Sequence, residues 1–173
     1  MKEILLKKFM DEEGRKVFNM ILRMVRNREE TEDLFQEVFT AFHQNLANVQ
    51  PEARRSYLYR IAYNKTLNRI KTIKRSHKLL QNQLNQPVLQ KEPSQEKRNA
   101  LIRESLGKLK ATEAFLIELQ FYQGKSYQEI SEITGYSVSS VDSRLVRAKR
   151  KLRDLLNRSG INNLQESQLS AVL

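Results

Sequence analysis

Two carboxylates that could do chemistry, Asp33 and Glu37, stand four residues apart in the segment REETEDLFQEVF. On a helix such a pair lies on one face and could hold a metal ion or divide the roles of general acid and base. Neither histidine, His43 nor His77, lies at metal-ligand spacing from the pair, and the chain has no cysteine and no glycine-rich phosphate loop. We therefore predict no catalytic residue, no metal and no cofactor.

The acidic face has two other interpretations. Helical spacing places its polar members opposite an apolar stripe that runs from Phe35 to Leu46, and these members are Asp33, Gln36, Glu37 and Thr40. Carboxylates near a helix start favour the helix dipole, so the face could simply be solvated. In a chain as basic as this one, it could also be a docking surface for a basic protein.

A second segment, SYQEISEITGYSVSSVDSRLVRAKRKL, predicts two short helices around a glycine. Ser126 and Glu129 have the spacing of a reciprocal capping box, which predicts that the first helix begins there. Gly135 can take the left-handed conformation that ends a helix, and Ser137 can cap the next one. A single apolar stripe follows through the second helix, formed by Val138, Val141, Leu145, Ala148 and Leu152.

The outer face of that second helix carries small polar side chains near its start and cationic side chains towards its end. Short side chains let a backbone approach a DNA major groove closely, and arginines can then reach bases or phosphates. A solvated amphipathic helix would be the alternative, but the capped pair around Gly135 favours a helix-turn-helix that binds DNA. Its candidate DNA-binding residues are Ser139, Ser140, Asp142, Ser143, Arg144 and Arg147.

A third segment, SYLYRIAYNKTLNRIKTIKR, lies in a stretch without acidic residues between Glu52 and Glu92. As one helix it carries a mixed face of an aromatic ring, two amides and three cations, namely Tyr57, Arg60, Asn64, Asn68, Lys71 and Arg75. Amides can bind base edges, tyrosine can stack on an unpaired base and cations can follow phosphates, so this face suits partly single-stranded DNA. Alternatively, Tyr57, Tyr59 and Tyr63 are core aromatics with hydrated hydroxyl groups.

The elements that must position these residues are helices. The chain has 173 residues with only five Gly and three Pro, and no Gly between Gly14 and Gly107, so we expect an all-α fold. Residues 77–98 are rich in Gln and Asn, include two Pro and lack an apolar stripe, which predicts a flexible linker between two small helical domains. The expected organisation is a first domain over 1–76, the linker over 77–98, a helix-turn-helix domain over 99–158 and a tail over 159–173.

Charge and hydropathy indicate the partner and the compartment. Lys and Arg number 31 against 20 Asp and Glu, a net charge of +11, which favours nucleic acid as partner and an anionic membrane surface second. No segment approaches the length of a membrane span and the N-terminus is not that of a signal peptide. We therefore expect a cytoplasmic protein without membrane insertion.

Taken together, the three segments resemble bacterial extracytoplasmic-function sigma factors, the small two-domain group of RNA polymerase sigma subunits. TEDLFQEVFTAF is similar to the region that binds core RNA polymerase, SYLYRIAYNKTLNRIK to the region that melts and reads the minus-ten element, and the helix-turn-helix to the region that reads the minus-thirty-five element. The three blocks occur in the family's order, with a linker in the expected place. The resemblance implies a subunit that directs polymerase to promoters and promotes strand opening.

The resemblance also implies roles for residues. Asp33, Gln36 and Glu37 align with polymerase-contacting positions, Asn64 with an asparagine that helps to hold a flipped promoter base, and the outer residues of the last helix with positions that meet duplex DNA. Core polymerase and promoter DNA, both duplex and melted, are thus the expected partners. An anti-sigma factor is a further expected partner, because members of the family are often sequestered by one.

Three positions depart from the family pattern. Tyr57 stands where many members have tryptophan, and Lys110 replaces a common proline at a helix entry. Asp142 occupies a place often held by Lys or Arg, so the aspartate either accepts from a cytosine amino group or caps the helix locally. The alternative to a sigma factor is a stand-alone helix-turn-helix regulator that binds duplex DNA without polymerase. An alternative from another class is a metal-dependent nuclease that uses the acidic cluster between Glu29 and Glu37.

Overall fold

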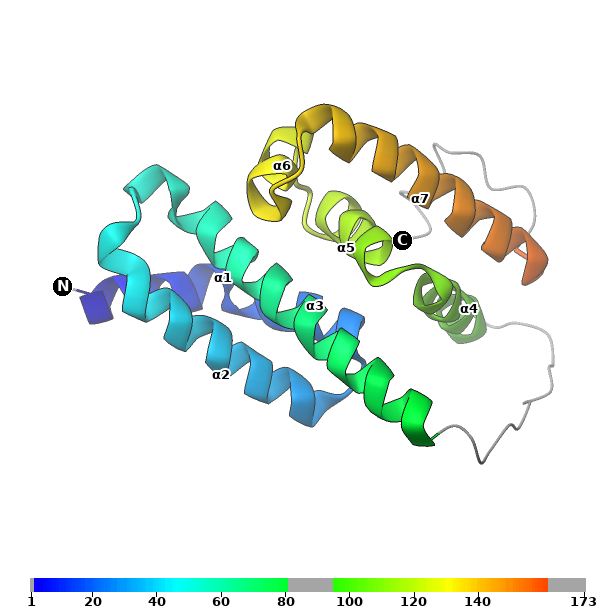
Figure 1. Ribbon diagram of the computed structural model, residues 1–173, viewed down its shortest axis with the longest axis horizontal. Helices are drawn as coiled ribbons and strands as arrows, with labels where there is room; N and C mark the ends of the chain where they lie inside the picture. Colours follow the sequence, from blue (N-terminus) through cyan, green and yellow to red (C-terminus); the bar gives the residue numbers. More distant parts are fainter. Residues whose placement is uncertain (1, 81–94, 162–173) are drawn as a thin grey trace.

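A computed structural model describes residues 2–80 and 95–161, and it contains helices and no strand within these ranges. The first domain holds α1 (Lys2–Val25), α2 (Arg28–Asn45) and α3 (Arg54–Leu80), with two short 3-10 turns, Leu46–Asn48 and Pro51–Ala53, between α2 and α3. The second holds α4 (Gln95–Lys108), α5 (Ala111–Ile117), a π-helical turn (Glu118–Tyr122), α6 (Tyr127–Thr134) and α7 (Val138–Arg158) (Figure 1).

This arrangement confirms the predicted all-α fold with two helical domains. α3 continues to Leu80 and α4 begins at Gln95, so both helices extend into the segment expected to be a linker. Residues 81–94 of the expected linker and 162–173 of the expected tail lie outside the described residues, as does the side chain of His77.

The core of the first domain is built from the periodic apolar positions of its helices. Val17, Ile21, Val38, Phe42 and Leu46 are at most 1 % exposed, as their spacing predicts. Asn27 starts α2 by accepting a hydrogen bond from the backbone N–H of Glu30 at 3.0 Å. The capped start fixes the register of α2, so its apolar stripe faces the core and its acidic residues face outward.

The second domain begins its helix-turn-helix as the sequence predicts. The Ser126 hydroxyl accepts from the backbone N–H of Glu129 at 3.2 Å, and the Glu129 carboxylate accepts from the backbone N–H of Ser126 at 2.8 Å. This backbone hydrogen bond is the main reason that the pKa of Glu129 lies below its usual range. Gly135 ends α6 with φ of 78° and Ser137 caps α7.

One core prediction for α7 was wrong. Val141, Leu145, Ala148 and Leu152 are fully buried, but Val138 is 41 % exposed. Val138 is the first residue of the helix, where no preceding turn covers its side chain. The apolar stripe therefore begins at Val141.

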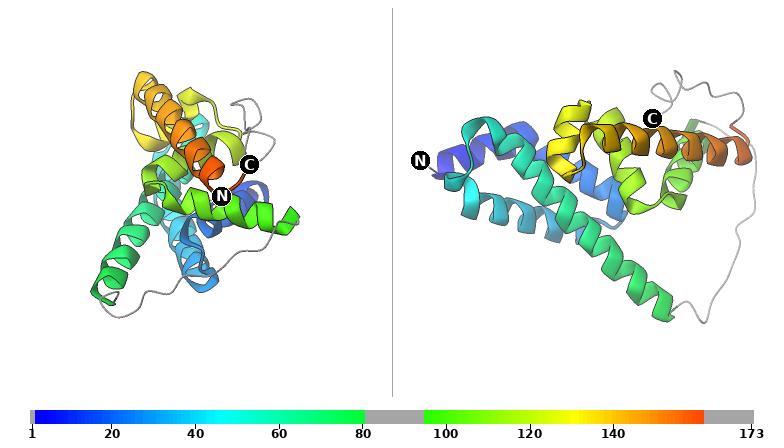
Figure 2. Two further views of the ribbon diagram at one scale, coloured as in Figure 1. Left: turned by 90° about the vertical axis from the view of Figure 1, so that its right-hand side faces the viewer. Right: turned by 45° about the horizontal axis from the view of Figure 1, so that its top comes forward.

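α3 joins the two domains. It packs on α1 and α2 on one side and on α5 and α6 on the other (Figures 1 and 2). Tyr59 and Tyr63 are 0 % and 4 % exposed, and the Tyr63 ring meets Phe115 of α5 edge to face at 5.0 Å between centroids. These two tyrosines are core aromatics, as the alternative interpretation of the sequence held, but the Tyr59 hydroxyl is not hydrated, because it donates to the buried Glu13.

A partly buried ion pair also crosses the domain boundary. The Arg23 guanidinium donates to both carboxylate oxygens of Glu118, at 2.7 and 2.6 Å, and Glu118 is only 3 % exposed. Burial lowers the pKa of Arg23, but the hydrogen bonds and charge of Glu118 outweigh it, so the net shift of this pKa is upward. The Arg23 side chain keeps 35 % of its exposure, so water shares in its solvation.

We expect Glu118→Ala to lower the free energy of unfolding, because it leaves the Arg23 charge half-buried and unpaired. Removing one partner of a fully buried pair costs about 3–5 kcal/mol, and the partial exposure of Arg23 reduces this to about 2 kcal/mol. Urea unfolding followed by far-UV circular dichroism measures the change. Glu104→Ala is the control, because Glu104 pairs with Lys108 on an exposed helix surface, and it should leave the midpoint unchanged. Equal midpoints for the two variants would contradict the role of the Arg23–Glu118 pair.

Candidate nucleic-acid and protein interfaces

The first candidate surface is the outer face of the N-terminal half of α7. Ser137 caps the helix by accepting from the backbone N–H of Ser140 at 3.2 Å, and α7 packs its apolar stripe on α4, α5 and α6. The six predicted DNA-binding residues then lie off that stripe. Ser139, Asp142, Ser143 and Arg147 are exposed, whereas Ser140 and Arg144 are half-buried.

Most of the polar groups on this face have local partners. Ser143 donates its hydroxyl to the carbonyl of Ser139 at 2.9 Å, and Arg147 Nε donates to the carbonyl of Ser143 at 3.2 Å. The Arg144 guanidinium lies 4.2 Å from the ring centroid of Tyr136, a cation–π contact that holds it at the turn. These contacts therefore hold the side chains of the face in place without a ligand. The face becomes more cationic towards Arg150.

The second candidate surface is the polar face of α3. Asn64, Asn68, Lys71 and Arg75 are exposed and follow one another along the helix, as their spacing predicts. Tyr57 is only half-buried, and its ring lies 6.3 Å from that of Phe42 between centroids. The structure thus leaves the two amides and two of the cations open to a ligand.

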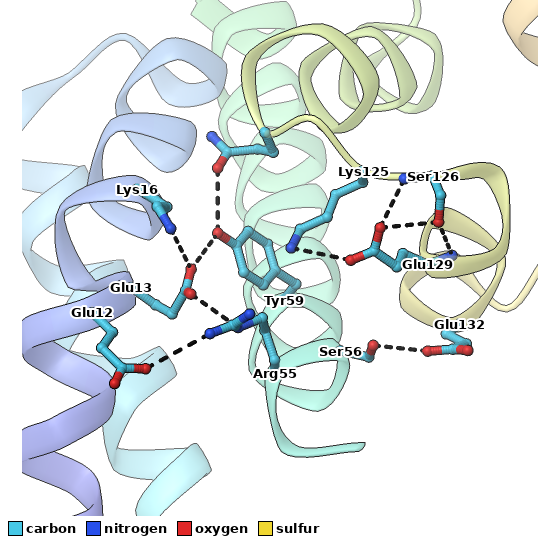
Figure 3. A network of polar contacts seen from close by, with 11 residues as sticks. Glu12, Glu13, Lys16, Arg55, Ser56, Tyr59, Lys125, Ser126, Glu129 and Glu132 are labelled. Carbon is cyan, nitrogen blue, oxygen red and sulfur yellow. Dashed lines mark hydrogen bonds and ion pairs between the residues drawn. The ribbon is translucent and has the colours of Figure 1, made fainter. Parts of the chain in front are cut away.

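Arg60 was predicted to share this open face, and the structure places it in contact with the second domain. Its Nε donates to the backbone carbonyl of Glu132 in α6 at 2.9 Å, and its Nη2 donates to the same oxygen. Ser56 donates to the Glu132 carboxylate at 2.8 Å beside it (Figure 3). In this arrangement the Nε and Nη2 donors of Arg60 bind α6, although the side chain as a whole stays exposed.

A buried polar cluster that was not predicted from the sequence lies next to this contact. Tyr59 donates its hydroxyl to Glu13 at 2.9 Å, and Arg55 Nε lies 3.0 Å from the other oxygen of Glu13, which is 2 % exposed (Figure 3). Burial, with the charge of Glu13 second, raises the pKa of Tyr59 far above its ordinary value, so this phenol stays protonated. Glu13 lies four residues before the buried Val17, on the apolar stripe of α1. This position in the sequence could have indicated that the Glu13 side chain is buried.

The third candidate surface is the acidic face of α2. Its four predicted members, Asp33, Gln36, Glu37 and Thr40, are all exposed and line one shallow hollow of about 450 Å³ together with Ala41, Gln44 and Lys65. The structure therefore brings these four residues together as predicted.

The two carboxylates of this hollow differ in their partners. Glu37 accepts from Lys65 and from Arg69, each at 2.9 Å, and the Lys65 hydrogen bond is the main reason that the pKa of Glu37 is lowered. Asp33 has no ion-pair partner among the residues that the structure describes. Residues 2–80 and 95–161 contain no group of three potential metal ligands around either carboxylate. The open negative charge of the hollow is therefore mainly that of Asp33.

These features define the class of protein: an all-helical, two-domain protein with a helix-turn-helix in its second domain and an exposed acidic face on its first. The sequence matches the families Sigma-70 region 2 over residues 9–76 and Sigma-70 region 4 over residues 99–152. The chain belongs to the sigma-70 family of RNA polymerase sigma factors, in its extracytoplasmic-function group, and is a sigma factor.

Individual relatives agree with this assignment. The chain is 32 % identical to RNA polymerase sigma factor SigZ of Bacillus subtilis over 143 residues, 79 % of this chain and 78 % of SigZ. It is 28 % identical to sigma factor YlaC of the same organism over 152 residues, 83 % of this chain and 87 % of YlaC. Among solved structures, the sigma factor RpoE of Bartonella quintana, in complex with the anti-sigma factor NepR, has the same fold with a TM-score of 0.69 and 19 % identity, over 91 % of this chain and 98 % of RpoE.

Proposed function

We propose that this protein binds core RNA polymerase, directs it to promoters through their minus-thirty-five and minus-ten elements and promotes strand opening. The observation that carries the proposal is the order of the two family matches: region 2 falls on the domain that holds α2 and α3, and region 4 on the domain that holds α7. Residues 1–76 would bind polymerase and the minus-ten element, residues 99–158 would bind the minus-thirty-five element, and residues 77–98 would connect them.

Each surface has a part in the proposed mechanism. The hollow of α2 would receive a basic part of polymerase, because the unpaired Asp33 supplies an exposed negative charge in a basic chain. The N-terminal half of α7 would enter the major groove. On α3, Asn64 and Asn68 would hold an extruded base while Lys71 and Arg75 follow the strand, so that base capture makes strand opening favourable.

The proposed role of Arg60 requires a rearrangement. Its Nε and Nη2 donate to the backbone of α6, and these donors would turn to DNA when α6 moves away from the start of α3. The domains would therefore separate when the protein joins polymerase. A change of this kind also fits a protein that alternates between a free state and a polymerase-bound state.

Further partners follow from the family. RpoE is described in complex with an anti-sigma factor, and we propose that this chain also has one. No helix in the described ranges is long and apolar enough to cross a membrane. A sigma subunit works on the chromosome with polymerase, so we place its action in the cytoplasm. Members of the sigma-70 family are not enzymes, and we propose no catalytic activity for this chain.

The test is reconstitution of the purified full-length chain with bacterial core RNA polymerase. We expect it to co-elute with polymerase in gel filtration and to give run-off transcripts from a promoter library, which core polymerase alone does not. Binding to duplex DNA without polymerase association would identify a stand-alone regulator instead.

Chelating divalent metal from the protein before mixing should leave its DNA binding unchanged, whereas a nuclease would lose its activity.

A further inference from the structure

Asp142 is an acidic side chain on the outer face of α7 with no local role. It is exposed, and its carboxylate makes no hydrogen bond or ion pair with residues 2–80 and 95–161. The N-terminus of α7 is capped by Ser137, so the carboxylate does not cap the helix. The interpretation of Asp142 as a local cap is therefore wrong, and its carboxylate is free to bind a ligand.

Val146, one helical turn further on, is the second unusual residue of this face. It is 49 % exposed, although the fully buried positions of α7 take up the apolar stripe on the opposite side. Its neighbours on the outer face are polar or cationic. Burying an exposed valine side chain against an apolar group of a partner is favourable, because it removes apolar surface from water.

Duplex DNA offers few groups that match this pair. A carboxylate among phosphates is repelled unless a donor faces it, and only cytosine and adenine present an amino group in the major groove. Adenine also presents the acceptor N7 beside its amino group, which opposes a carboxylate, whereas cytosine presents the donor alone. The only apolar group on any base edge there is the C5-methyl of thymine, which suits Val146.

On the basis of the function proposed above, we propose that Asp142 and Val146 set the minus-thirty-five preference of this protein, with Asp142 reading a cytosine and Val146 a thymine. Residues four apart on a helix are separated by about 6 Å along its axis. Successive base pairs of duplex DNA are about 3.4 Å apart along the helix axis. The two bases therefore lie one or two base pairs apart.

Transcription from a library tests the role of Asp142. Core polymerase with the full chain selects among promoters randomised upstream of a fixed minus-ten element. We expect cytosine at one position to be favoured about 10-fold over other bases. Asp142→Asn should shift this position alone towards adenine, because an amide can pair with both the amino group and N7 of adenine. Asp154→Asn changes the same charge at an exposed site further along α7, and it should leave the selected sequence unchanged.

Deletion of one methyl group tests the role of Val146. Replacing the selected thymine by deoxyuridine should weaken wild-type binding about 3- to 4-fold, since one buried methyl group is lost. The Val146→Ser variant should bind the thymine and the deoxyuridine templates equally. Ile4→Ser, a matched change of a residue that is 77 % exposed on α1, should retain the difference.

The outcomes separate this inference from the proposed function. If transcription persists and Asp142→Asn selects the same base as the wild type, the inference is overturned and the sigma-factor function stands. An unchanged preference for thymine over deoxyuridine in Val146→Ser would overturn the thymine assignment in the same way. If neither wild type nor variants associate with polymerase, the proposed function itself fails, together with the inference that rests on it.

Discussion

Asp33→Arg is expected to reduce binding to core RNA polymerase by about 30-fold or more, which corresponds to roughly 2 kcal/mol, the threshold for an interface hot spot. Asp33 lines the hollow on α2, is exposed and has no ion-pair partner in the described part of the chain. An arginine there would face a basic partner with the same charge, and such juxtaposition costs several kcal/mol. Fluorescence anisotropy of the labelled protein against increasing core polymerase measures the dissociation constant.

The change at Asp33 is more informative than one at Glu37. Glu37 holds Lys65 and Arg69, so reversing its charge would place three cations together and weaken the packing of α2 on α3. Asp11→Arg is the matched control, because it makes the same charge change at an exposed site on α1. Equal losses for both variants would show that net charge alone drives the association, and the docking role of α2 would then be withdrawn.

The sequence predicted the local structure well because local structure depends on near neighbours. The capping box at Ser126, the left-handed Gly135 and the cap at Ser137 each involve residues within a few positions, and all three occur in the structure. The grouping of the acidic residues of α2 also follows from helical spacing alone.

Contacts between distant segments could not be predicted in this way. Arg23 and Glu118 are 95 residues apart, and nothing in either segment specifies the other. Periodicity placed Arg60 on the same face as Asn64, but the packing of α6 against the start of α3 gives its guanidinium a backbone acceptor. Such pairings depend on how two domains dock, which side-chain spacing within one helix does not encode.

Buried polar groups were missed for a related reason. Glu13 looks like one more surface charge of a lysine-rich helix, yet Tyr59 and Arg55 from α3 satisfy its carboxylate inside the core. A buried carboxylate is tolerated only with such partners, and these come from a different helix. The position of Glu13 on the apolar stripe was a signal, but the identity of its partners required the fold.

Asn64→Ala is expected to reduce open-complex formation by about 5- to 150-fold, equivalent to about 1–3 kcal/mol for one amide that recognises a base edge. The Asn64 side chain is exposed on α3, and Asn68 lies one turn further on. The amide would bind the extruded base only after the duplex opens, so its loss should act on opening. Permanganate reactivity of unpaired thymines at the promoter measures the open fraction.

The design separates strand opening from duplex recognition. Binding of the polymerase complex to a fragment that ends upstream of the minus-ten element should be the same for wild type and Asn64→Ala, because only the domain that holds α7 contacts such DNA in the proposed mechanism. Asn157→Ala removes an exposed amide near the end of α7, remote from α3 in sequence, and should leave the open fraction unchanged. If Asn64→Ala weakens binding to the upstream fragment as much as it weakens opening, the residue acts on the whole complex. The assignment of base capture to α3 would then be wrong. A loss confined to strand opening would instead mean that recognition of the minus-ten element and strand separation occur in a single step.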